Sequence, residues 1–224
     1  MPPVPRPSDV AEPLDRGARA RERLLRVAAQ IFAEKGFDKA STREICQAAE
    51  LNIAAIHYHF GGKEGLYREV LLVPVREISA QFAGLKAPDL PLEDALRLLL
   101  AAFVQLVGHP EGVQTMKLHL REMADPSPGY LEAMIGQIRP QYEAICAAVA
   151  RHIGLPEPDD AVHQLVNGLI AMAQDFCISR DFYLALRPSL IDGHEALQRA
   201  LDRMVEWGCA IVAHERHKRR AHGA

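Results

Sequence analysis

Long apolar runs are missing from this sequence of 224 residues. A membrane-spanning helix needs about 20 consecutive apolar residues, whereas even the apolar stretch 95–107 is interrupted by Arg97 and Gln105. Residues 1–15 are rich in proline and charge and contain no apolar segment of the kind that signal peptides carry. We therefore expect a soluble, cytoplasmic protein with no membrane partner, and a disordered arm over residues 1–15.

Closely spaced cysteines are also missing. Cys46, Cys146, Cys177 and Cys209 lie far apart inside apolar helical patterns, whereas zinc knuckles need close pairs and secreted disulfide scaffolds need a higher density. We interpret the four as buried, reduced thiols. The alternative is a redox-sensing thiol, which requires an exposed and electropositive setting.

The motifs of catalysis are absent as well. The sequence has no Gly-rich phosphate-binding loop and no nucleophile elbow. It contains ten histidines, but His194-Glu195 and His214-Glu215 lack the second histidine that a zinc-protease helix requires. We expect a protein that is not an enzyme and that uses no metal and no cofactor.

Charge is unevenly distributed along the chain, although the formal net charge is only −3. Residues 16–68 contain ten Lys/Arg and six Asp/Glu, a net charge of +4, whereas residues 69–224 contain fifteen Lys/Arg and twenty Asp/Glu, a net charge of −5. A basic segment suits a polyanion. The first part of the chain is therefore the candidate for nucleic-acid binding.

Apolar residues recur every three or four positions along most of the chain, which predicts an all-α fold of about nine helices. The length favours one small domain and one larger domain. We place a DNA-binding three-helix bundle at 16–66, a larger ligand-binding and dimerisation domain at 67–217 and a basic tail at 218–224. That tail either decorates a fraying terminus or makes a second DNA contact. The expected helices cover 19–35, 42–49, 53–60, 63–85, 91–108, 111–123, 130–153, 159–180 and 193–217.

Two short helices with a tight turn between them follow the first long helix, which is the helix-turn-helix pattern. Gly36 ends the first helix, and Ser41 with Glu44 has the spacing of a capping box at the start of the second. Asn52 is a good N-cap for the third. Two glycines at 61–62 close the unit.

The stretch Ser41-Thr42-Arg43-Glu44-Ile45, followed by Leu-Asn-Ile-Ala-Ala-Ile-His-Tyr-His-Phe-Gly-Gly-Lys-Glu-Gly-Leu at 51–66, resembles the signature of the TetR family of transcriptional regulators. The resemblance extends over about residues 19–67. The segments Leu-Arg-Glu-Met-Ala-Asp-Pro-Ser at 120–127 and Ile-Arg-Pro at 138–140 resemble the CecR-like branch, which is associated with drug sensitivity and efflux control. The resemblance implies a dimer that responds to a small molecule.

Two positions depart from the family pattern. Glu50 stands where the family usually has glycine, at a turn that suits a left-handed backbone, and this costs roughly 1 kcal/mol. His57 replaces a frequent tyrosine, so that a phosphate contact passes to imidazole or is lost.

A recognition helix that enters the major groove needs small residues near its start, and Ala54 and Ala55 meet this need. Arg43 pairs either with guanine or with phosphate, two interpretations of equal weight. Tyr58 either contacts the DNA backbone or packs in the core. The candidate DNA-binding residues are Thr42, Arg43, Asn52, Ala54, Ala55, His57, Tyr58, His59 and Lys63.

Tight binding requires two half-sites of a pseudo-palindromic operator on double-stranded DNA, read by a homodimer with its recognition helices roughly 34 Å apart. The resemblance implies that the last two long helices form this dimer as a four-helix bundle. Some of their apolar residues must instead face the ligand domain. The candidate dimerisation residues are Val162, Leu165, Val166, Leu169, Leu201, Val205 and Ile211.

The resemblance also implies a small-molecule cavity among the middle helices. A mixed apolar wall with a few polar groups is typical of such pockets, and equally of ordinary helical cores. The candidate ligand-binding residues are Leu100, Phe103, Met116, His119, Met134, Asn167, Gln174 and Phe176.

Together these features predict a ligand-responsive DNA-binding regulator: a repressor of efflux or drug-response genes that a small molecule releases from its operator. The alternatives are an activator with the same fold, and a dimeric helical scaffold without DNA binding, for which Glu50 and His57 are the only hints. Salt-dependent binding to its own upstream DNA separates a regulator from a scaffold or an enzyme.

Overall fold

The computed structural model describes residues 13–87, 89–127 and 129–222. These residues contain ten α-helices, two short 3₁₀ helices and no strand, which confirms the expected all-α class. The chain divides into two compact units, one ending at Val70 and the other beginning at Leu71. Residues 1–12 of the expected arm lie outside the described residues, whereas residues 13–15 already belong to the first helix.

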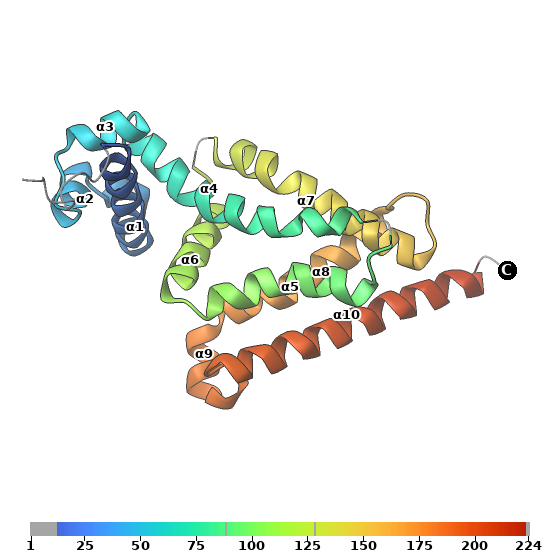
Figure 1. The fold of residues 1–224 in the computed structure, drawn as a ribbon. Coiled ribbons are helices and arrows are strands. Elements are labelled where there is room, and N and C mark those ends of the chain that lie inside the picture. Colours follow the sequence, from blue (N-terminus) through green and yellow to red (C-terminus); the bar gives the residue numbers. More distant parts are fainter. Residues whose placement is uncertain (1–12, 88, 128, 223–224) are drawn as a thin grey trace, which may run out of the picture. The chain divides into compact units, whose positions relative to one another are not determined.

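The first unit consists of α1 (Pro13–Lys39), α2 (Thr42–Ala48), α3 (Ala54–Phe60) and the beginning of α4 (Lys63–Gln81) (Figure 1). Gly36 adopts φ 78° and interrupts the helical geometry of α1, as expected from its position. An edge-to-face contact joins Phe32 to Tyr67 of α4, with ring centroids 4.8 Å apart. The fully buried side chains of this unit are Leu24, Ala28, Phe32, Ile45, Ala49, Ile56 and Leu66.

Glycine makes the tight turn from α3 to α4 possible. Gly61 has a left-handed backbone with φ 74°, which only glycine adopts without cost. A Cβ atom on Gly65 would lie 1.8 Å from the Phe60 carbonyl oxygen. The turn therefore closes against the backbone of the recognition helix.

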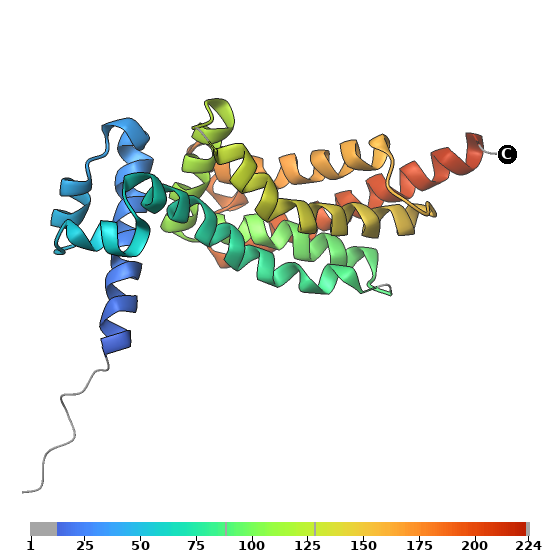
Figure 2. The same cartoon turned by 90° about the horizontal axis from the view of Figure 1, so that it is seen from above.

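The second unit contains the rest of α4 and all later elements (Figures 1 and 2). They are the 3₁₀ helix η1 (Phe82–Lys86), α5 (Leu92–Val107), α6 (Pro110–Ala124), α7 (Tyr130–Ile153), α8 (Asp160–Ile178), α9 (Arg180–Leu186), the 3₁₀ helix η2 (Pro188–Leu190) and α10 (His194–His222).

The apolar helix α5 forms the centre of the second unit, where it packs against α6, α7, α8 and α10. Leu96 and Leu100 of α5 meet Leu169 of α8 and Met204 of α10 in one buried cluster. A Cβ atom on Gly208 would lie 2.9 Å from a methyl group of Leu96. Glycine at this position therefore lets α10 approach α5 closely.

The C-terminal part departs from expectation in two ways. The expected helix 159–180 ends earlier, at Ile178, and a separate helix α9 follows it; the Ser179 hydroxyl donates to the Asp175 carboxylate at 2.8 Å. The helix α10 continues to His222, where a basic tail was expected from residue 218. Arg219 of α10 donates two hydrogen bonds to Asp159, at 2.7 and 3.1 Å, so its guanidinium is engaged within the protein.

The described helices include none with both the length and the apolar character needed to cross a membrane. Cys46, Cys146 and Cys177 are buried free thiols, and Cys209 is partly buried. Burial raises the pKa of all four thiols, that of Cys177 to about 12. Because the thiolate is the reactive form, this disfavours the redox-sensing alternative.

Candidate nucleic-acid interface and ligand cavity

The turn between α2 and α3 closes through a left-handed residue at the position where its sequence departs from glycine. Glu50 has φ 53° and is the only non-glycine residue with positive φ among those described. Its amide donates to the Gln47 carbonyl at 3.1 Å, and the Leu51 amide donates to the Cys46 carbonyl at 2.9 Å. Arg23 of α1 donates to the Glu50 carboxylate at 2.7 Å. The turn therefore keeps its geometry without glycine.

The two short helices begin differently from each other. Ser41 precedes α2 but makes no side-chain cap hydrogen bond, and the Glu44 carboxylate pairs with Lys35 instead, so the expected capping box is wrong. Asn52 does act at the start of α3, because its Oδ1 accepts from the Ala54 amide at 3.0 Å. The Asn52 side-chain oxygen is thus engaged in holding the recognition helix.

The outer face of α3 carries most of the candidate DNA-binding residues. Ala54, His57 and Tyr58 are exposed, whereas Ala55 and His59 are partly buried beside the fully buried Ile56. The Tyr58 side chain is 85% exposed, which excludes the alternative that it packs in the core. On α2, Arg43 is exposed and Thr42 is partly buried.

Lys63 differs from the other candidates because its ammonium group already has partners. Its Nζ donates to the Asp38 carbonyl at 3.3 Å and lies 4.4 Å from the centroid of the Phe37 ring. These contacts join the start of α4 to the end of α1. A DNA phosphate that binds Lys63 would therefore compete with these contacts for its ammonium group.

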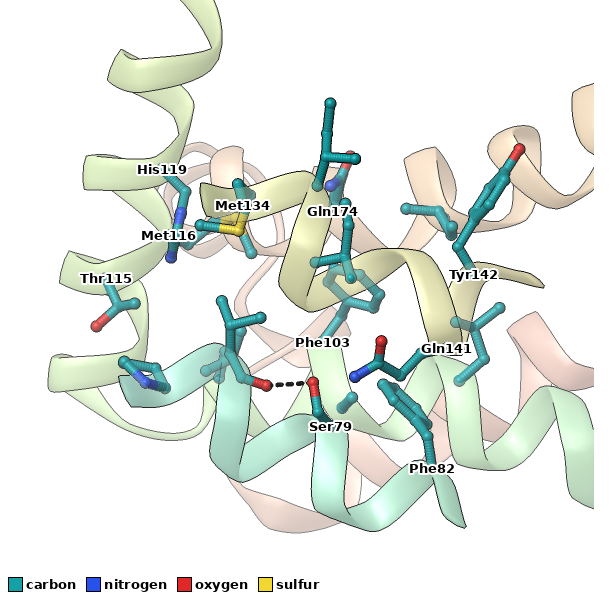
Figure 3. A pocket seen from close by; sticks show the side chains of 18 of the residues that line it. Ser79, Phe82, Phe103, Thr115, Met116, His119, Met134, Gln141, Tyr142 and Gln174 are labelled. Carbon is teal, nitrogen blue, oxygen red and sulfur yellow. Dashed lines mark hydrogen bonds between the residues drawn. The ribbon is translucent and has the colours of Figure 1, made fainter. Parts of the chain in front are cut away.

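The second unit contains a partly open cavity of about 380 Å³ between α4, η1, α5, α6, α7 and α8 (Figure 3). This volume is within the range of small-molecule pockets. Five of the eight candidate ligand-binding residues line it: Phe103, Met116, His119, Met134 and Gln174.

The other three candidates lie elsewhere. Leu100 is fully buried in the cluster that α5 forms with α8 and α10. Asn167 is exposed on α8. Phe176 packs with Tyr183 of α9, at 5.7 Å between ring centroids. Helical periodicity marked all three as core or polar positions but did not say which side of the helix faces the cavity.

Sequence reasoning missed the contribution of α4 and, apart from Met134, that of α7. Ser79 and the apolar Pro74 and Val75 line the cavity from α4, and Gln141 and Tyr142 line it from α7. Exposed apolar residues of α7 also line it: Leu131, Ile135 and Ile138. Their spacing of four and three residues was a signal available in the sequence.

Two polar atoms in the cavity wall are buried and make no hydrogen bond: Nε2 of His119 and Oε1 of Gln141. The other ring nitrogen of His119, Nδ1, lies 3.2 Å from the Tyr130 hydroxyl. Burial lowers the pKa of His119 to about 4, against the opposing effects of a backbone interaction with Leu71, which does not meet hydrogen-bond geometry at Nε2, and of the Glu122 carboxylate. Burial, aided by Glu122, raises the pKa of Tyr130 to about 12. Both side chains are therefore neutral at pH 7.

Most of the candidate dimerisation residues are buried in the interior of the second unit. Val162, Val166, Leu169, Leu201 and Val205 are buried in its core clusters, and Leu165 packs against them. A side chain enclosed by its own protomer has no surface to offer a second one. Ile211 differs, since it is 42% exposed on α10, one turn after Trp207, which is 48% exposed.

An exposed recognition helix on a small helical unit, followed by a helical unit that contains an apolar cavity, defines a helix-turn-helix transcriptional regulator. The chain belongs to the TetR family of bacterial regulatory proteins: the model of that family's DNA-binding domain matches residues 24–70, and the model of the C-terminal domain of the HTH-type transcriptional dual regulator CecR matches residues 92–210. It is accordingly a DNA-binding regulator and not an enzyme.

Comparisons with individual proteins support this assignment. The chain is 30% identical to the transcriptional dual regulator CecR of Shigella flexneri over 70% of its own length and 76% of that protein. It is 24% identical to the transcriptional regulator TcmR of Streptomyces glaucescens, over 82% of each chain. The crystal structure of the TetR family regulator PfmR from Thermus thermophilus shares the fold, with a TM-score of 0.62 and 22% identity over 83% of this chain and 96% of that one.

Proposed function

We propose that this protein is a homodimeric repressor that a small molecule releases from its operator. The observation that carries the proposal is the cavity of the second unit, whose wall buries the unpartnered Nε2 of His119 and Oε1 of Gln141. Buried polar atoms without partners cost free energy, on the order of 1–3 kcal/mol each, and a bound ligand removes that cost.

DNA would be read by the outer faces of α2 and α3. Exposed Ala54 and partly buried Ala55 let the helix approach base edges, while Arg43 supplies either a base contact or a phosphate contact. His57, Tyr58 and His59 would bind the DNA backbone. Thr42 and Lys63 would contact phosphates at helix ends, with Asn52 holding the start of α3.

The dimer would form through the outward faces of α8 and α10. Trp207 and Ile211 provide exposed apolar surface on α10, and Gly168 and Ala171 provide an exposed, small-residue surface on α8. Small residues allow two helices to approach closely, and large apolar ones supply buried area. The buried candidates beneath them, such as Val166 and Leu201, would support this face from inside.

Coupling would pass through α4. This helix contributes Pro74, Val75 and Ser79 to the cavity wall, and its first residues belong to the DNA-binding unit. A ligand that binds one arrangement of α4 better than another shifts the equilibrium between them. Ligand binding would thereby change the separation of the two recognition helices, and the dimer would leave its operator.

Two relatives bear on whether this protein represses or activates transcription. NicS of Pseudomonas putida, 31% identical over 134 residues, is a transcriptional repressor, whereas CecR is a dual regulator. The second name favours activation as a further role at some promoters. Efflux and drug-response genes are the proposed targets, because residues 120–127 and 138–140 resemble the CecR-like branch.

The test is titration of the purified protein onto a labelled double-stranded fragment from its own upstream region, monitored by fluorescence anisotropy. Binding through six to ten phosphate contacts should weaken by about 10³–10⁵ between 50 and 200 mM salt. Drug-like compounds are then screened for release. A protein that is monomeric, or that ignores duplex DNA at low salt, contradicts the proposal.

A further inference from the structure

The charge of the cavity wall in the second unit bears on which ligands the cavity can bind. Among the described residues that line it there is no Asp, Glu, Lys or Arg. Within this described part of the wall the ionisable groups are one imidazole and two phenols, from His119, Tyr130 and Tyr142. All three are neutral at pH 7, because burial lowers the pKa of the imidazole and raises the pKa of both phenols.

A charged molecule would therefore lose its hydration in this cavity without gaining a counter-charge. Transfer of an unpaired ion into an apolar environment is far more costly than transfer of a neutral polar group that finds a hydrogen bond. Glu122 is buried nearby, where its carboxylate accepts hydrogen bonds from the amide and the hydroxyl of Ser127, both at 2.8 Å, and it does not line the cavity. Its negative charge acts on His119 and Tyr130 in the wall. The wall thus selects against charge, and most strongly against anions.

The same wall offers two positions for hydrogen bonds. His119 projects from α6 and Gln141 from α7, and Figure 3 shows them on either side of Phe103. The Oε1 atom of Gln141 is an acceptor without a donor. If the Tyr130 hydroxyl donates to Nδ1 of His119, Nε2 carries the ring proton; the Leu71 backbone acts on this ring, but no acceptor meets hydrogen-bond geometry at Nε2, so the donor is left to a ligand. Apolar side chains make up most of the rest of the wall, among them Met116, Met134 and Ile145.

We propose that the effector is an uncharged molecule with an apolar body, a hydrogen-bond donor that meets Gln141 and an acceptor that meets His119. This inference rests on the proposed function and adds the chemical class of the ligand to it. The volume of about 380 Å³ corresponds to the small end of ligand pockets. The exposed apolar residues Leu131, Ile135 and Ile138 on α7 extend the apolar surface from the cavity to the outside.

Two fluorescent probes of one skeleton test the selection against charge. N-phenyl-1-naphthylamine is neutral and has one N–H donor, and 8-anilinonaphthalene-1-sulfonate adds an anionic group to the same two ring systems. Both become fluorescent in apolar surroundings. We expect the neutral probe to bind the full-length dimer at least tenfold more tightly than the sulfonate. Equal affinities, or a preference for the sulfonate, overturn the proposal.

A charge placed in the wall should reverse this preference. Gln141→Lys puts a cation where the amide lies, so the sulfonate should gain at least tenfold in affinity relative to the neutral probe. Gln105→Lys is the matched control, because Gln105 is exposed on α5 and does not line the cavity. Circular dichroism confirms that both variants are folded. If the two lysine variants change the preference equally, or not at all, the probes bind elsewhere and the proposal fails.

Failure of this inference and failure of the proposed function give different results. Release of operator DNA is measured in parallel, with N-phenyl-1-naphthylamine as the added compound. Selective binding of this probe without release supports the ligand class and contradicts the coupling. Release by charged compounds, with no preference for the neutral probe, supports the coupling and overturns the ligand class. Gln141→Leu gives a second measurement, since loss of the acceptor should weaken the neutral probe several-fold.

Discussion

Arg23 and Glu50 are joined by a hydrogen bond of 2.7 Å between guanidinium and carboxylate, at the residue where the helix-turn-helix adopts a left-handed backbone. Glycine avoids the steric cost of that backbone, roughly 1 kcal/mol, and the ion pair offsets part of it for glutamate. Both side chains are largely exposed, so the pair contributes at most about 1 kcal/mol. The turn is thus built from a strained residue that its neighbour supports.

Replacement of Glu50 separates these two effects. Glu50→Gly removes the backbone strain and the ion pair together, so the free energy of unfolding should change by less than about 1 kcal/mol. Glu50→Ala removes the ion pair but keeps the strain, and should be about 1 kcal/mol less stable than Glu50→Gly. Urea unfolding of the two variants measures the difference. Equal stabilities would mean that the left-handed backbone carries no cost.

Tyr58 should contribute to DNA affinity and not to stability. Its side chain is 85% exposed, so Tyr58→Ala should alter the free energy of unfolding by no more than about 0.5 kcal/mol. Loss of a phosphate contact should weaken operator binding by a factor of roughly 10 to 100, since one hydrogen bond to a charged group contributes about 1.5–3 kcal/mol. Phe182→Ala, which removes an exposed aromatic ring of α9, is the matched control in the anisotropy assay. An effect of equal size in both variants would argue against the assignment.

The buried imidazole of His119 should make stability depend on pH. Its pKa in the folded protein is about 4, below the ordinary value of 6.5, so between these values the unfolded chain binds a proton that the folded chain does not. Stability from this group is therefore complete above pH 6.5 and is lost as pH falls toward 4. Between pH 6.5 and 5 the loss is roughly 1.5 kcal/mol.

The comparison of wild type with His119→Gln isolates this contribution. The variant removes the imidazole, so its unfolding free energy should fall less steeply between pH 6.5 and 5 than that of the wild type. Glu122 and Tyr130 act on the same ring and stay unchanged in both proteins. The matched control is His109→Gln, which removes an exposed imidazole. If the unfolding free energies of wild type and His119→Gln depend on pH in the same way, burial does not lower the pKa of the imidazole.

Asp159 connects the start of α8 to the end of α10. Its carboxylate accepts from Arg219 and, at 3.1 Å, from the Val162 amide, and these contacts lower the pKa of Asp159. The stabilisation is present above the unfolded pKa and is lost as pH falls through the lower, folded value. Asp159→Asn keeps a capping oxygen and loses the charge, so it should cost less than Asp159→Ala, which loses about 1 kcal/mol as a cap. Thermal unfolding at pH 7 compares the two; a larger loss for Asn contradicts this explanation.

Most helices were predictable from the sequence to within a few residues because apolar periodicity, glycine and capping residues are local properties. The exceptions are α9, which was not expected, the start of α1 and the end of α10. Gly36 ends regular geometry in α1, and Asn52 holds the start of α3, as expected. The break at Ser179 was not predictable in this way. It depends on Asp175, which accepts hydrogen bonds from both Ser179 and Tyr183.

The function of buried apolar residues was harder to predict than their burial. Periodicity marks Val166 and Leu201 as buried but does not say whether a neighbouring helix or a second chain covers them; the structure places both in the core of one protomer. The cavity likewise depends on which faces of α4 and α7 turn toward α5. Gln141 and Ser79 are separated by more than sixty residues in the chain, and only the fold brings them to one wall.

The outward face of α10 provides the last test, that of the dimer. Ile211 is 42% exposed in the protomer, so Ile211→Glu should not lower the stability of an isolated protomer by more than about 0.5 kcal/mol. At a symmetric interface, however, each substitution places a carboxylate in both copies, and two unpaired charges disfavour association. Light scattering should therefore show monomers, and operator affinity should fall with the loss of the second half-site. Leu186→Glu is the matched control: Leu186 is also an exposed apolar residue, but it belongs to α9 and does not line the cavity, and its variant should remain dimeric. Dimeric Ile211→Glu with unchanged operator binding would place the dimer contact elsewhere on the second unit.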